Sequence, residues 1–345
     1  MVAVWSMFDR GYYYPAAVRF DDQALGTVVQ STTKMNSMSS IVFDDGTIVV
    51  VGSVSGGESP VLAVITLAPG DDAWSEPTAA DMTPAGFSGT GSITKTAAGP
   101  VFAIDQWSGE DGWVNPRDVW HLSGNAQEGY SLALDTSLNA NPDGDDSPVT
   151  LSTVGDTAIA IWVDRNYNTG SSRLVSSVRI GDGAWTFPVT IDDSGDDYYG
   201  ISVTADGAQG VYASWVATTE TGRTVSYAHY SVDSDPTQGS WTAPTVALGP
   251  DDTLQSQSWI GADGSGGVHL LASTLVGSWP NSVSSTYAYH LTMDLPAGSW
   301  SACTTPSEQM CVDLEHATVT KADSTSMSLA EAGLGLSVTT LDGPT

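Results

Sequence analysis

Basic side chains are scarce in this sequence, in which 10 Lys and Arg residues stand against 40 Asp and Glu residues, for a formal net charge of −30. A surface with this charge repels nucleic acid phosphates, so we expect no nucleic acid partner. The origin of the acidity has two open explanations. It fits a salt-adapted or calcium-rich extracellular surface, where cations relieve the self-repulsion, and it fits a solvated acidic shell that keeps the protein soluble.

Cysteine and long apolar segments are also scarce. The two cysteines, Cys303 and Cys311, are close enough in sequence to close a short loop with a disulfide in an oxidising compartment, and two reduced, buried thiols are the alternative. No Cys and His cluster has the spacing of a zinc site. No run approaches the roughly 18 apolar residues of a membrane span, so we expect no membrane insertion.

The N-terminus lacks the basic region and the apolar core of a secretory leader. Either the numbering is that of a mature extracellular chain, or the protein reaches the outside by another route, such as assembly into a virus particle. We therefore expect an extracellular or virion-surface location.

Residues that favour strands and turns are abundant. The chain of 345 residues has 36 Gly, 12 Trp and 12 Tyr but only 6 Phe, and 14% of its residues are charged. β-Branched and aromatic residues favour strands, whereas Gly, Asp, Asn and Ser favour turns. Because a disordered chain would carry fewer aromatic residues and more charge, the composition indicates a folded, all-β protein.

A short aromatic segment recurs at intervals of about 55–60 residues, and this repeat is the most informative feature of the sequence. Its clearest copies are Asp72–Pro77, Gly183–Pro188 and Gly239–Pro244, each with a Trp inside it. The aromatic residues that mark the copies are Tyr14, Trp74, Tyr130, Trp185, Trp241 and Trp300.

A second marker keeps the same period. Pairs of alternating segments are joined by short turns of small residues, which is typical of β-hairpins. The turns lie at Asp45-Gly46, Ala98-Gly99, Gly155-Asp156, Asp206-Gly207, Asp263-Gly264 and Asp323-Ser324. Two markers in phase indicate that the chain is built from repeated units.

Each repeat holds four short strands. In one repeat they are expected near Ile201–Ala205, Val211–Ala217, Thr224–Val232 and Ser240–Leu248. Four antiparallel strands in about 55 residues are typical of one β-propeller blade, and a blade must pack on the next one to cover its apolar faces. The sequence therefore predicts a six-bladed β-propeller that forms one domain over residues 1–345.

The two ends of the chain are expected to complete the last blade together. The chain begins with strands at Val2–Phe8 and Tyr13–Phe20, and it ends with strands at Ala317–Lys321 and Ser326–Ala330. A further strand-like segment, Leu336–Leu341, leaves open whether the ends contribute two strands each or three and one.

The aromatic segments resemble the Asp-box repeats, Ser-x-Asp-x-Gly-x-Thr-Trp, of sialidase-like propellers. The copies are degenerate: Ser231-Val-Asp233 precedes Gly239-Ser-Trp241, Asp294 precedes Gly298-Ser-Trp300, and Asp182–Trp185 and Ser6–Gly11 are partial. In that family the Asp box is a folding element on the face away from the active site. The resemblance therefore implies structural roles for Asp9, Asp182, Asp233, Asp294 and the Trp series.

The catalytic residues of that family are not matched as a set, and we assign none. Its sialidases carry three arginines that bind a carboxylate, a Tyr–Glu nucleophile pair, an acid/base Asp and an early Phe/Tyr-Arg-Ile-Pro motif. The nearest string here is Ala17-Val-Arg-Phe20. Arg117, Arg165 and Arg223 are expected between the second and third strands of three successive blades, where they would suit a carboxylate or would pair with nearby Asp residues.

Aromatic and acidic residues are concentrated in segments expected on one face of the propeller. This combination is typical of sugar recognition, because aromatic rings stack on sugar faces and acceptors bind hydroxyls. The alternative is that the rings fill seams between blades, which is our interpretation for Trp162 and Trp215. Together with the three arginines, the predicted ligand-binding residues are Trp107, Glu110, Asp111, Trp113, Tyr167, Tyr198, Tyr199, Trp259 and Trp279.

One acidic segment predicts a calcium site, the only cofactor expected. Side chains with oxygen atoms occupy every second position of this segment, and Gly144 is at the sixth position, as in the first half of a Ca²⁺ loop. The Glu expected at the twelfth position is replaced by Thr150, so an acidic turn without metal is the alternative. The predicted ligands are Asn139, Asn141, Asp143 and Asp145.

The five His residues show neither a Ser-His-Asp pattern nor a metal-ligand pattern. His229 and His290 fall at matching positions of two repeats, and we interpret both as structural.

These observations favour a non-catalytic recognition module. We expect it to bind a cell-surface glycan or receptor or, as part of a phage or archaeal virus tail, neighbouring virion proteins; the virion assignment rests on fold-level analogy. Two alternatives stay open. One is a glycoside hydrolase or polysaccharide lyase that uses some of the carboxylates, and the other is a scaffold for protein partners.

Overall fold

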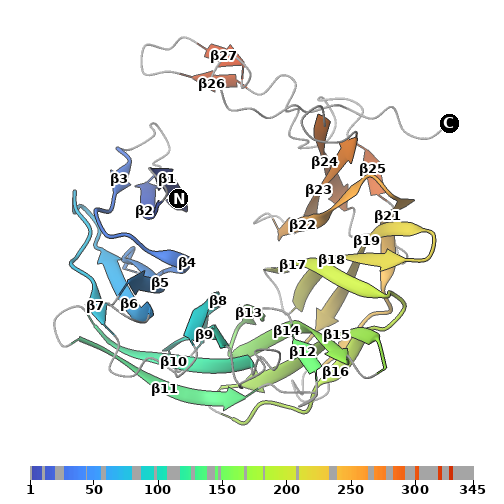
Figure 1. The fold of residues 1–345 in the computed structure, drawn as a ribbon, viewed down its shortest axis with the longest axis horizontal. Coiled ribbons are helices and arrows are strands. Elements are labelled where there is room, and N and C mark those ends of the chain that lie inside the picture. The colour runs from blue at the N-terminus through green and yellow to red at the C-terminus, as the bar shows by residue number, and fades with distance from the viewer. Residues whose placement is uncertain are drawn as a thin grey trace. The chain divides into compact units, whose positions relative to one another are not determined.

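A computed structural model of the chain contains strands and, among the described residues, no helix (Figure 1). It describes residues 2–9, 12–19, 27–43, 45–55, 60–79, 87–96, 99–106, 117–125, 129–137, 144–146, 149–166, 169–181, 183–206, 210–232, 239–262, 268–276, 283–291, 300–302, 318–320 and 326–328. Within these ranges, no helix is long and apolar enough to span a membrane. The prediction of an all-β chain is confirmed.

The chain divides into two compact units. Unit 1 comprises Met1–Gly170 and Val175–Val189, and unit 2 comprises Ser171–Leu174 and Thr190–Thr345. The division falls within the strands β15 (Ser171–Ile180) and β16 (Val189–Asp192). The prediction of a single domain over residues 1–345 stays a prediction.

In unit 1, successive strands of a sheet are neighbours in the chain, which is the order that short hairpins produce. The sheets have the orders β1-β2-β3, β4-β5-β6-β7 and β8-β9-β10-β11, and β12 and β13 both pair with β14. Their bounds are β1 (Val2–Asp9), β2 (Tyr12–Arg19), β3 (Val29–Gln30), β4 (Asn36–Val42), β5 (Ile48–Ser55), β6 (Pro60–Leu67), β7 (Thr78–Ala79), β8 (Phe87–Thr96), β9 (Gly99–Gln106), β10 (Arg117–Asn125), β11 (Gly129–Ser137), β12 (Gly144–Asp146), β13 (Thr150–Val154) and β14 (Thr157–Asn166).

Unit 2 repeats this pattern. Its sheets have the orders β17-β18-β19-β20, with β21 also pairing β19, then β22-β23-β24-β25 and β26-β27. The bounds are β17 (Asp197–Ala205), β18 (Gly210–Thr219), β19 (Gly222–Ser231), β20 (Ser240–Trp241), β21 (Thr245–Asp251), β22 (Leu254–Ala262), β23 (Val268–Val276), β24 (Val283–Leu291), β25 (Trp300–Ala302), β26 (Thr318–Thr320) and β27 (Ser326–Ser328).

The strands predicted in the repeat between Ile201 and Leu248 are observed as β17 to β21, with the last one split into two short strands. The N-terminal sheet has three strands instead of the two that the sequence predicted, because Val29 and Gln30 of β3 pair with Ala17 and Ala16 of β2. A strand of two residues has no alternation to read, which is why it was missed. The number of blades and the closure of the ring stay predictions.

The middle strands are apolar on both faces. All residues from Ala158 to Val163 of β14 are at most 1% exposed, and Val211 to Ala217 of β18 are equally continuous in their burial. A strand covered on both sides needs no polar face, so it reads as a continuous apolar run. Trp162 and Trp215 lie in these two runs and are 0% exposed, which agrees with the core role predicted for them.

The residue after the repeated Trp has a structural role that the sequence analysis missed. In three copies its hydroxyl accepts a hydrogen bond from a backbone N–H of the third strand of the same sheet. The N–H groups of Thr66, Val178 and His229 donate to the hydroxyls of Ser75, Thr186 and Thr242 at 2.9, 3.0 and 3.0 Å. Each hydroxyl thus satisfies a donor of the third strand, which explains why Ser or Thr follows Trp in the repeat.

The repeated tryptophans themselves also make structural contacts. Trp74 Nε1 donates to the carbonyl of Val29 at 3.0 Å, and the ring of Trp241 lies 5.4 Å from that of Tyr230. The Asp-box carboxylates of Asp182, Asp233 and Asp294 lie outside the described residues, and only the backbone of Asp9, in β1, is described. The Asp-box interpretation therefore stays a prediction.

Neighbouring sheets within each unit are joined through their first strands at the spacing of the repeat. In unit 1, the hydroxyls of Thr94 and Thr153 are 3.1 Å apart across 59 residues. In unit 2, Ser258 Oγ donates to the carbonyl of Gly200 at 3.0 Å across 58 residues. The period read from the sequence is therefore the distance along the chain between adjacent sheets.

Candidate functional site

The end of β14 brings acidic and basic residues together at one edge of unit 1, called here the acidic edge (Asp145, Asp146, Asp164 and Arg165). In the register of Cα atoms, Asp146 faces Asp164 and Asp145 faces Arg165. Asp164 is 3% exposed and Arg165 is half-buried. Asp145 was predicted as a calcium ligand and Arg165 as a carboxylate ligand, so the fold joins two sites that the sequence analysis kept apart.

The turn after β14 holds this edge in place. The N–H of Gly170 donates to the carbonyl of Asn166 at 2.8 Å, and the N–H of Thr169 donates to Asn166 Oδ1 at 3.2 Å. Gly170 has φ +70°, a conformation that residues with a Cβ rarely adopt. Residues directly opposite each other on paired strands share a face of the sheet, and successive residues alternate, so the positions of Asp146 and Asp164 lie on one face and those of Asp145 and Arg165 on the other. Carboxylates at paired positions can share acid and base roles.

A second buried aspartate, Asp192 in unit 2, has a structural role. It is 5% exposed, and its carboxylate accepts hydrogen bonds from Trp215 Nε1 at 2.9 Å, from the N–H of Ser194 at 3.0 Å and from Ser194 Oγ at 2.7 Å. Both carboxylate oxygens are occupied by donors of the protein. Asp192 therefore serves to fix the segment before β17 on the core of unit 2.

Tyr198 and Tyr199 are the second and third residues of β17, and both were predicted to bind ligand. Tyr198 is 1% exposed, and its hydroxyl accepts a hydrogen bond from the N–H of Gly195 at 2.8 Å. Burial raises the pKa of Tyr198 well above the ordinary tyrosine value, so the phenol stays neutral. Tyr199 is partly buried against the core of unit 2, with Val216 and Leu254 in the same cluster.

Two other predicted ligand residues of unit 2 lie in different surroundings. Trp259 is 45% exposed on β22, facing Leu271 of β23, so its ring is open to solvent. Arg223 is half-buried, and its Nη1 donates to the carbonyl of Leu254 at 2.9 Å. That bond attaches β19 to β22, which is a structural contact for a side chain predicted to bind a carboxylate.

Unit 2 contains a Ser-His-Asp array that the sequence analysis did not find. His229 Nε2 lies 2.9 Å from Asp206 Oδ2, and His229 Nδ1 lies 3.2 Å from Ser231 Oγ. Asp206 also accepts the N–H of Gly210 at 3.0 Å, and the rings of Tyr212 and His229 are 4.3 Å apart. The three residues come from a turn and a strand far apart in sequence order, so no local motif marks them.

This array resembles a nucleophilic triad in its partners, but the repeat favours a structural role. In the next sheet, His290 faces His269 as His229 faces Tyr212. A histidine that recurs at the same position of two sheets is better explained as part of the scaffold. The bond to Asp206 fixes the turn between β17 and β18 on β19, which supports our interpretation of His229 as structural.

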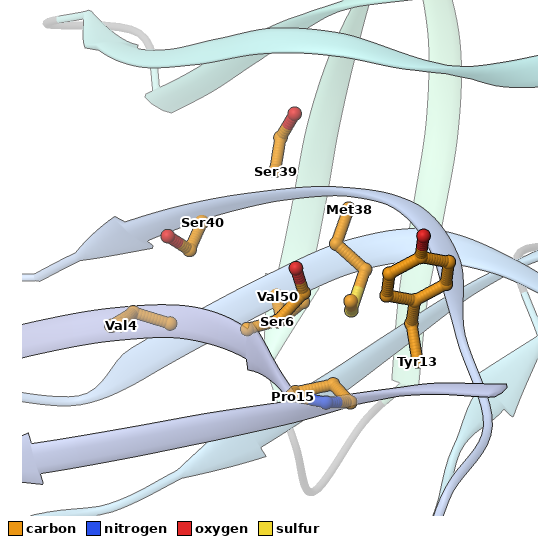
Figure 2. A pocket seen from close by; sticks show the side chains of 8 residues that line it. All are labelled: Val4, Ser6, Tyr13, Pro15, Met38, Ser39, Ser40 and Val50. Atoms are coloured by element: carbon orange, nitrogen blue, oxygen red, sulfur yellow. The ribbon is translucent and has the colours of Figure 1, made fainter. Parts of the chain in front are cut away.

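Unit 1 contains a pocket between two of its sheets (Figure 2). Its volume is about 320 Å³, which lies at the lower end of the range for ligand pockets. Its wall combines apolar and hydroxyl side chains and carries no charge. The lining residues are Val4, Ser6, Tyr13, Pro15, Met38, Ser39, Ser40 and Val50.

A β-bulge explains why three consecutive residues of β4 line this pocket. The register moves from Asn36↔Ser53 to Ser39↔Val51, so β4 has one residue more than β5 over this stretch. A bulge breaks the strict alternation of side chains between the two faces of a strand. Gly52, opposite the bulge, makes room for it, since a Cβ there would lie 3.0 Å from Met38 Cγ.

The remaining predicted site residues are outside the described residues or described only by their backbone. Arg117 begins β10 opposite Asp105, and Asp145 lies in β12, with no side chain described for either. Among the described residues, no group of three or more His, Cys, Asp or Glu could hold a metal ion. Outside the described ranges lie Trp107, Glu110, Asp111, Trp113, Asn139, Asn141, Asp143, Tyr167, Trp279, Cys303 and Cys311.

Comparison with known proteins gives similarity in structure only. No family model matches the sequence, and no curated protein matches it. A polysaccharide lyase, an ulvan lyase solved with a GlcA(1-4)Rha3S ligand, is similar with a TM-score of 0.54 and 10% identity over 81% of this chain and 70% of its own. An α-L-arabinofuranosidase from Fusarium graminearum is similar with a TM-score of 0.51 and 12% identity, over 77% of this chain and 79% of its own. An α-L-arabinanase from Penicillium chrysogenum is similar with a TM-score of 0.50 and 10% identity, over 77% of this chain and 80% of its own.

These neighbours are β-propellers. The likeness shows a propeller fold for this chain, and at 10–12% identity it shows the fold alone. The coarser part of the predicted fold is thereby confirmed.

The expectation of a non-catalytic recognition module is corrected by the same comparison. The similar structures are glycoside hydrolases and a polysaccharide lyase, so they favour the enzymatic alternative. The absence of the sialidase motif had indicated lost catalysis, and this inference is wrong. A propeller can host other chemistries at other positions, so the absence of one motif carries little weight.

Proposed function

We propose that this protein is a carbohydrate-active enzyme, a glycoside hydrolase that cleaves an uncharged polysaccharide. The observation that carries the proposal is the structural similarity, over 77% of the chain or more, to propellers that act on glycosidic bonds. One fold can host many functions, so the charge and the carboxyl groups of the chain itself decide between the reactions of these propellers.

The charge of the protein favours a neutral substrate. At a net charge of −30, the protein repels polyuronates and sulfated glycans over distances of about 10 Å at ordinary ionic strength. Lyases abstract a proton next to a uronate carboxylate, so they require an acidic substrate. A hydrolase requires only two carboxyl groups and water, and carboxyl groups are what this chain has in excess.

The acidic edge is the candidate for the catalytic residues. Asp164, which is 3% exposed, takes the role of the general acid. Asp146, its Cα partner across the strands, takes the role of base or nucleophile.

The test is an activity screen of the full chain on neutral polysaccharides, such as arabinan, galactan and levan, with release of reducing ends as the measurement. We expect hydrolysis of at least one, and a loss of about 10²–10⁴-fold in kcat/KM in Asp164→Asn and Asp146→Asn. Asp156→Asn, at an exposed turn before the same strand, serves as the matched control. Absence of hydrolysis, or full activity in both variants, would refute this assignment.

A polysaccharide lyase is the second candidate, favoured by the TM-score of 0.54 to the ulvan lyase. The same screen should therefore include ulvan, alginate and polygalacturonate, with the ultraviolet absorbance of unsaturated uronate ends as the measurement. Both reactions form a new reducing end, so unsaturated uronate ends formed in equal number with the reducing ends would select the lyase, and reducing ends without unsaturation would select the hydrolase.

Six blades in a closed ring are part of the same proposal. The six copies of the aromatic marker support this number, and the strand-like segments that the sequence has at both ends of the chain support closure. A closed ring would hold loops from successive blades around one site, which a polymer substrate needs.

A further inference from the structure

The wall of the pocket in unit 1 is built by the registers of its strands. On β1 and β2, Ser6 faces Pro15 across the sheet, and Val4 and Tyr13 each lie two residues before one of them. Residues opposite each other on paired strands share a face, as do residues two positions apart. The other wall comes from β4 and β5, where the bulge of β4 turns consecutive side chains toward the same space (Figure 2).

The buried part of this pocket is apolar. Val50 is 1% exposed, and Pro15 is also buried. Val4 and Met38 are partly buried and pack against the core cluster that contains Val50. A ligand with apolar C–H groups gains free energy when it leaves water for this surface.

The exposed part of the pocket is polar. Tyr13 is 45% exposed, Ser6 and Ser40 are exposed, and Ser39 is partly buried. Each of these hydroxyls can both donate and accept a hydrogen bond, as the hydroxyls of a sugar do. A purely apolar ligand would take water away from them without replacing its hydrogen bonds, which costs free energy. The wall has no basic side chain to bind a carboxylate, sulfate or phosphate group.

The backbone that carries the Tyr13 ring is fixed to the segment before β4. The carbonyl of Tyr13 accepts the N–H of Met35 at 3.0 Å, and the carbonyl of Pro15 accepts the N–H of Ser31 at 2.8 Å. These bonds hold β2 in place beside the chain that leads into the opposite wall. A ligand therefore meets a wall that is already ordered, which reduces the free energy lost on binding.

We propose that this pocket binds one residue of an uncharged polysaccharide. The Tyr13 ring stacks on the apolar face of the sugar, and the serine hydroxyls bind its hydroxyl groups. The inference rests on the proposed function, because it concerns the same class of substrate. None of the lining residues belongs to the acidic edge, so the pocket is a second site that holds the polymer away from the cleaved bond. Its volume of about 320 Å³ suits a single sugar residue better than a long segment.

Affinity electrophoresis measures this binding separately from cleavage. Native gels contain arabinan, galactan or levan, and a protein that binds the polysaccharide migrates more slowly. We expect at least one of the three to retard the wild-type protein, and Tyr13→Ala to raise the Kd about tenfold, because it removes the stacking ring. The matched control is Phe187→Ala, which removes an aromatic ring of unit 1 that is 93% exposed and does not line the pocket. Its Kd should equal that of the wild-type protein.

Two results would overturn the proposal. One is that none of the three polysaccharides retards the wild-type protein, and the other is that Tyr13→Ala and the wild-type protein have equal Kd values.

A second variant keeps the aromatic ring and fills the pocket instead. Ser6 is exposed on the wall, so Ser6→Leu should leave Tm close to that of the wild-type protein. The larger side chain occupies space that the sugar needs, so we expect the Kd to rise about tenfold. Ser6→Ala, which removes only the hydroxyl, should raise the Kd less. An unchanged Kd in a folded Ser6→Leu would count against a sugar in this pocket, whatever the stability of Tyr13→Ala.

The outcomes separate this proposal from the hydrolase proposal, because the gel measures binding and the release of reducing ends measures cleavage. Retardation that depends on Tyr13, without release of reducing ends, would refute the hydrolase and support the sugar site. Release of reducing ends that depends on Asp164, with retardation unaffected in Tyr13→Ala and Ser6→Leu, would refute the sugar site alone.

Discussion

Trp162 in unit 1 and Trp215 in unit 2 occupy the same position of two second strands, β14 and β18, and both are 0% exposed. They differ in their hydrogen bonds. Trp215 Nε1 donates to Asp192 at 2.9 Å, whereas Trp162 Nε1 has no hydrogen-bond partner among the described residues. Both sheets bury an indole ring at this position, but only the sheet of Trp215 provides a hydrogen-bond acceptor for its N–H. The comparison separates what packing requires from what a buried polar group adds.

Loss of Asp192 should have the largest effect. Asp192→Ala leaves the indole N–H of Trp215 and two donors of Ser194 without their acceptor, so we expect the free energy of unfolding to fall by about 3 kcal/mol. Urea unfolding followed by tryptophan fluorescence measures it. Asp192→Asn keeps an acceptor for the indole and should lose clearly less. Equal losses in both variants would show that the carboxylate charge, and not the acceptor geometry, dominates.

Replacement of each tryptophan by Phe sharpens the comparison. Trp162→Phe and Trp215→Phe remove the same buried area, but only the second removes a donor from Asp192. We expect Trp215→Phe to cost about 1–2 kcal/mol more than Trp162→Phe. The measurement is again urea unfolding, and the double variant with Asp192→Ala should show a coupling of the same size. Equal costs would mean that the bond at 2.9 Å contributes nothing net.

Removal of the hydroxyl that follows the repeated Trp should lower the free energy of unfolding by a smaller amount, and by the same amount in both units. Thr186→Val and Thr242→Val remove the acceptors for the N–H groups of Val178 and His229. Each should cost about 1 kcal/mol, since both hydroxyls lie where water can replace part of the bond. A shift in the urea midpoint measures it. A large effect in one unit alone would contradict a shared role of the repeat.

At neutral pH, the buried phenols of unit 2 should contribute no pH dependence. Burial raises the pKa values of Tyr198, Tyr212 and Tyr230 above the ordinary value of about 10. Above this pH the unfolded chain loses protons that the folded chain keeps, so stability is complete below about pH 10 and falls as the pH rises further. Urea midpoints from about pH 8 to about pH 11 measure the slope, and Tyr198→Phe should reduce it. A flat profile in the wild-type protein would contradict the burial of these phenols.

Many of the strands could be predicted from the sequence because hairpins form between residues that are close together in the chain. Alternation and turn residues gave β18 and β19 to within two residues of their observed bounds, since a hairpin is decided by its own residues. The start of β17 was placed four residues late, at Ile201 instead of Asp197. The strand β3 and the break between β20 and β21 were not predicted, because pairing of a strand of two residues, such as β3 or β20, is decided by the partner strand.

The candidate site was less readable. Asp145 and Arg165 were assigned to separate sites, and their meeting depends on the pairing of β12 with the far end of β14. The array of Asp206, His229 and Ser231 was missed for the same reason. Of the predicted ligand residues, Tyr198 proved to be in the core, because an aromatic residue beside acidic ones has the same sequence pattern whether its ring points inward or outward.

The sequence by itself determined the period of the chain, its strands and the residues that must be buried, because these follow from side-chain chemistry repeated along one dimension. Only the tertiary structure decided which buried polar groups find partners, which acidic residues share an edge and where a pocket lies between two sheets of unit 1. These features depend on distances between residues far apart in the chain, such as Asp192 and Trp215 or Gly200 and Ser258. Local propensity carries no information about such distances, since they are fixed only when the sheets pack together.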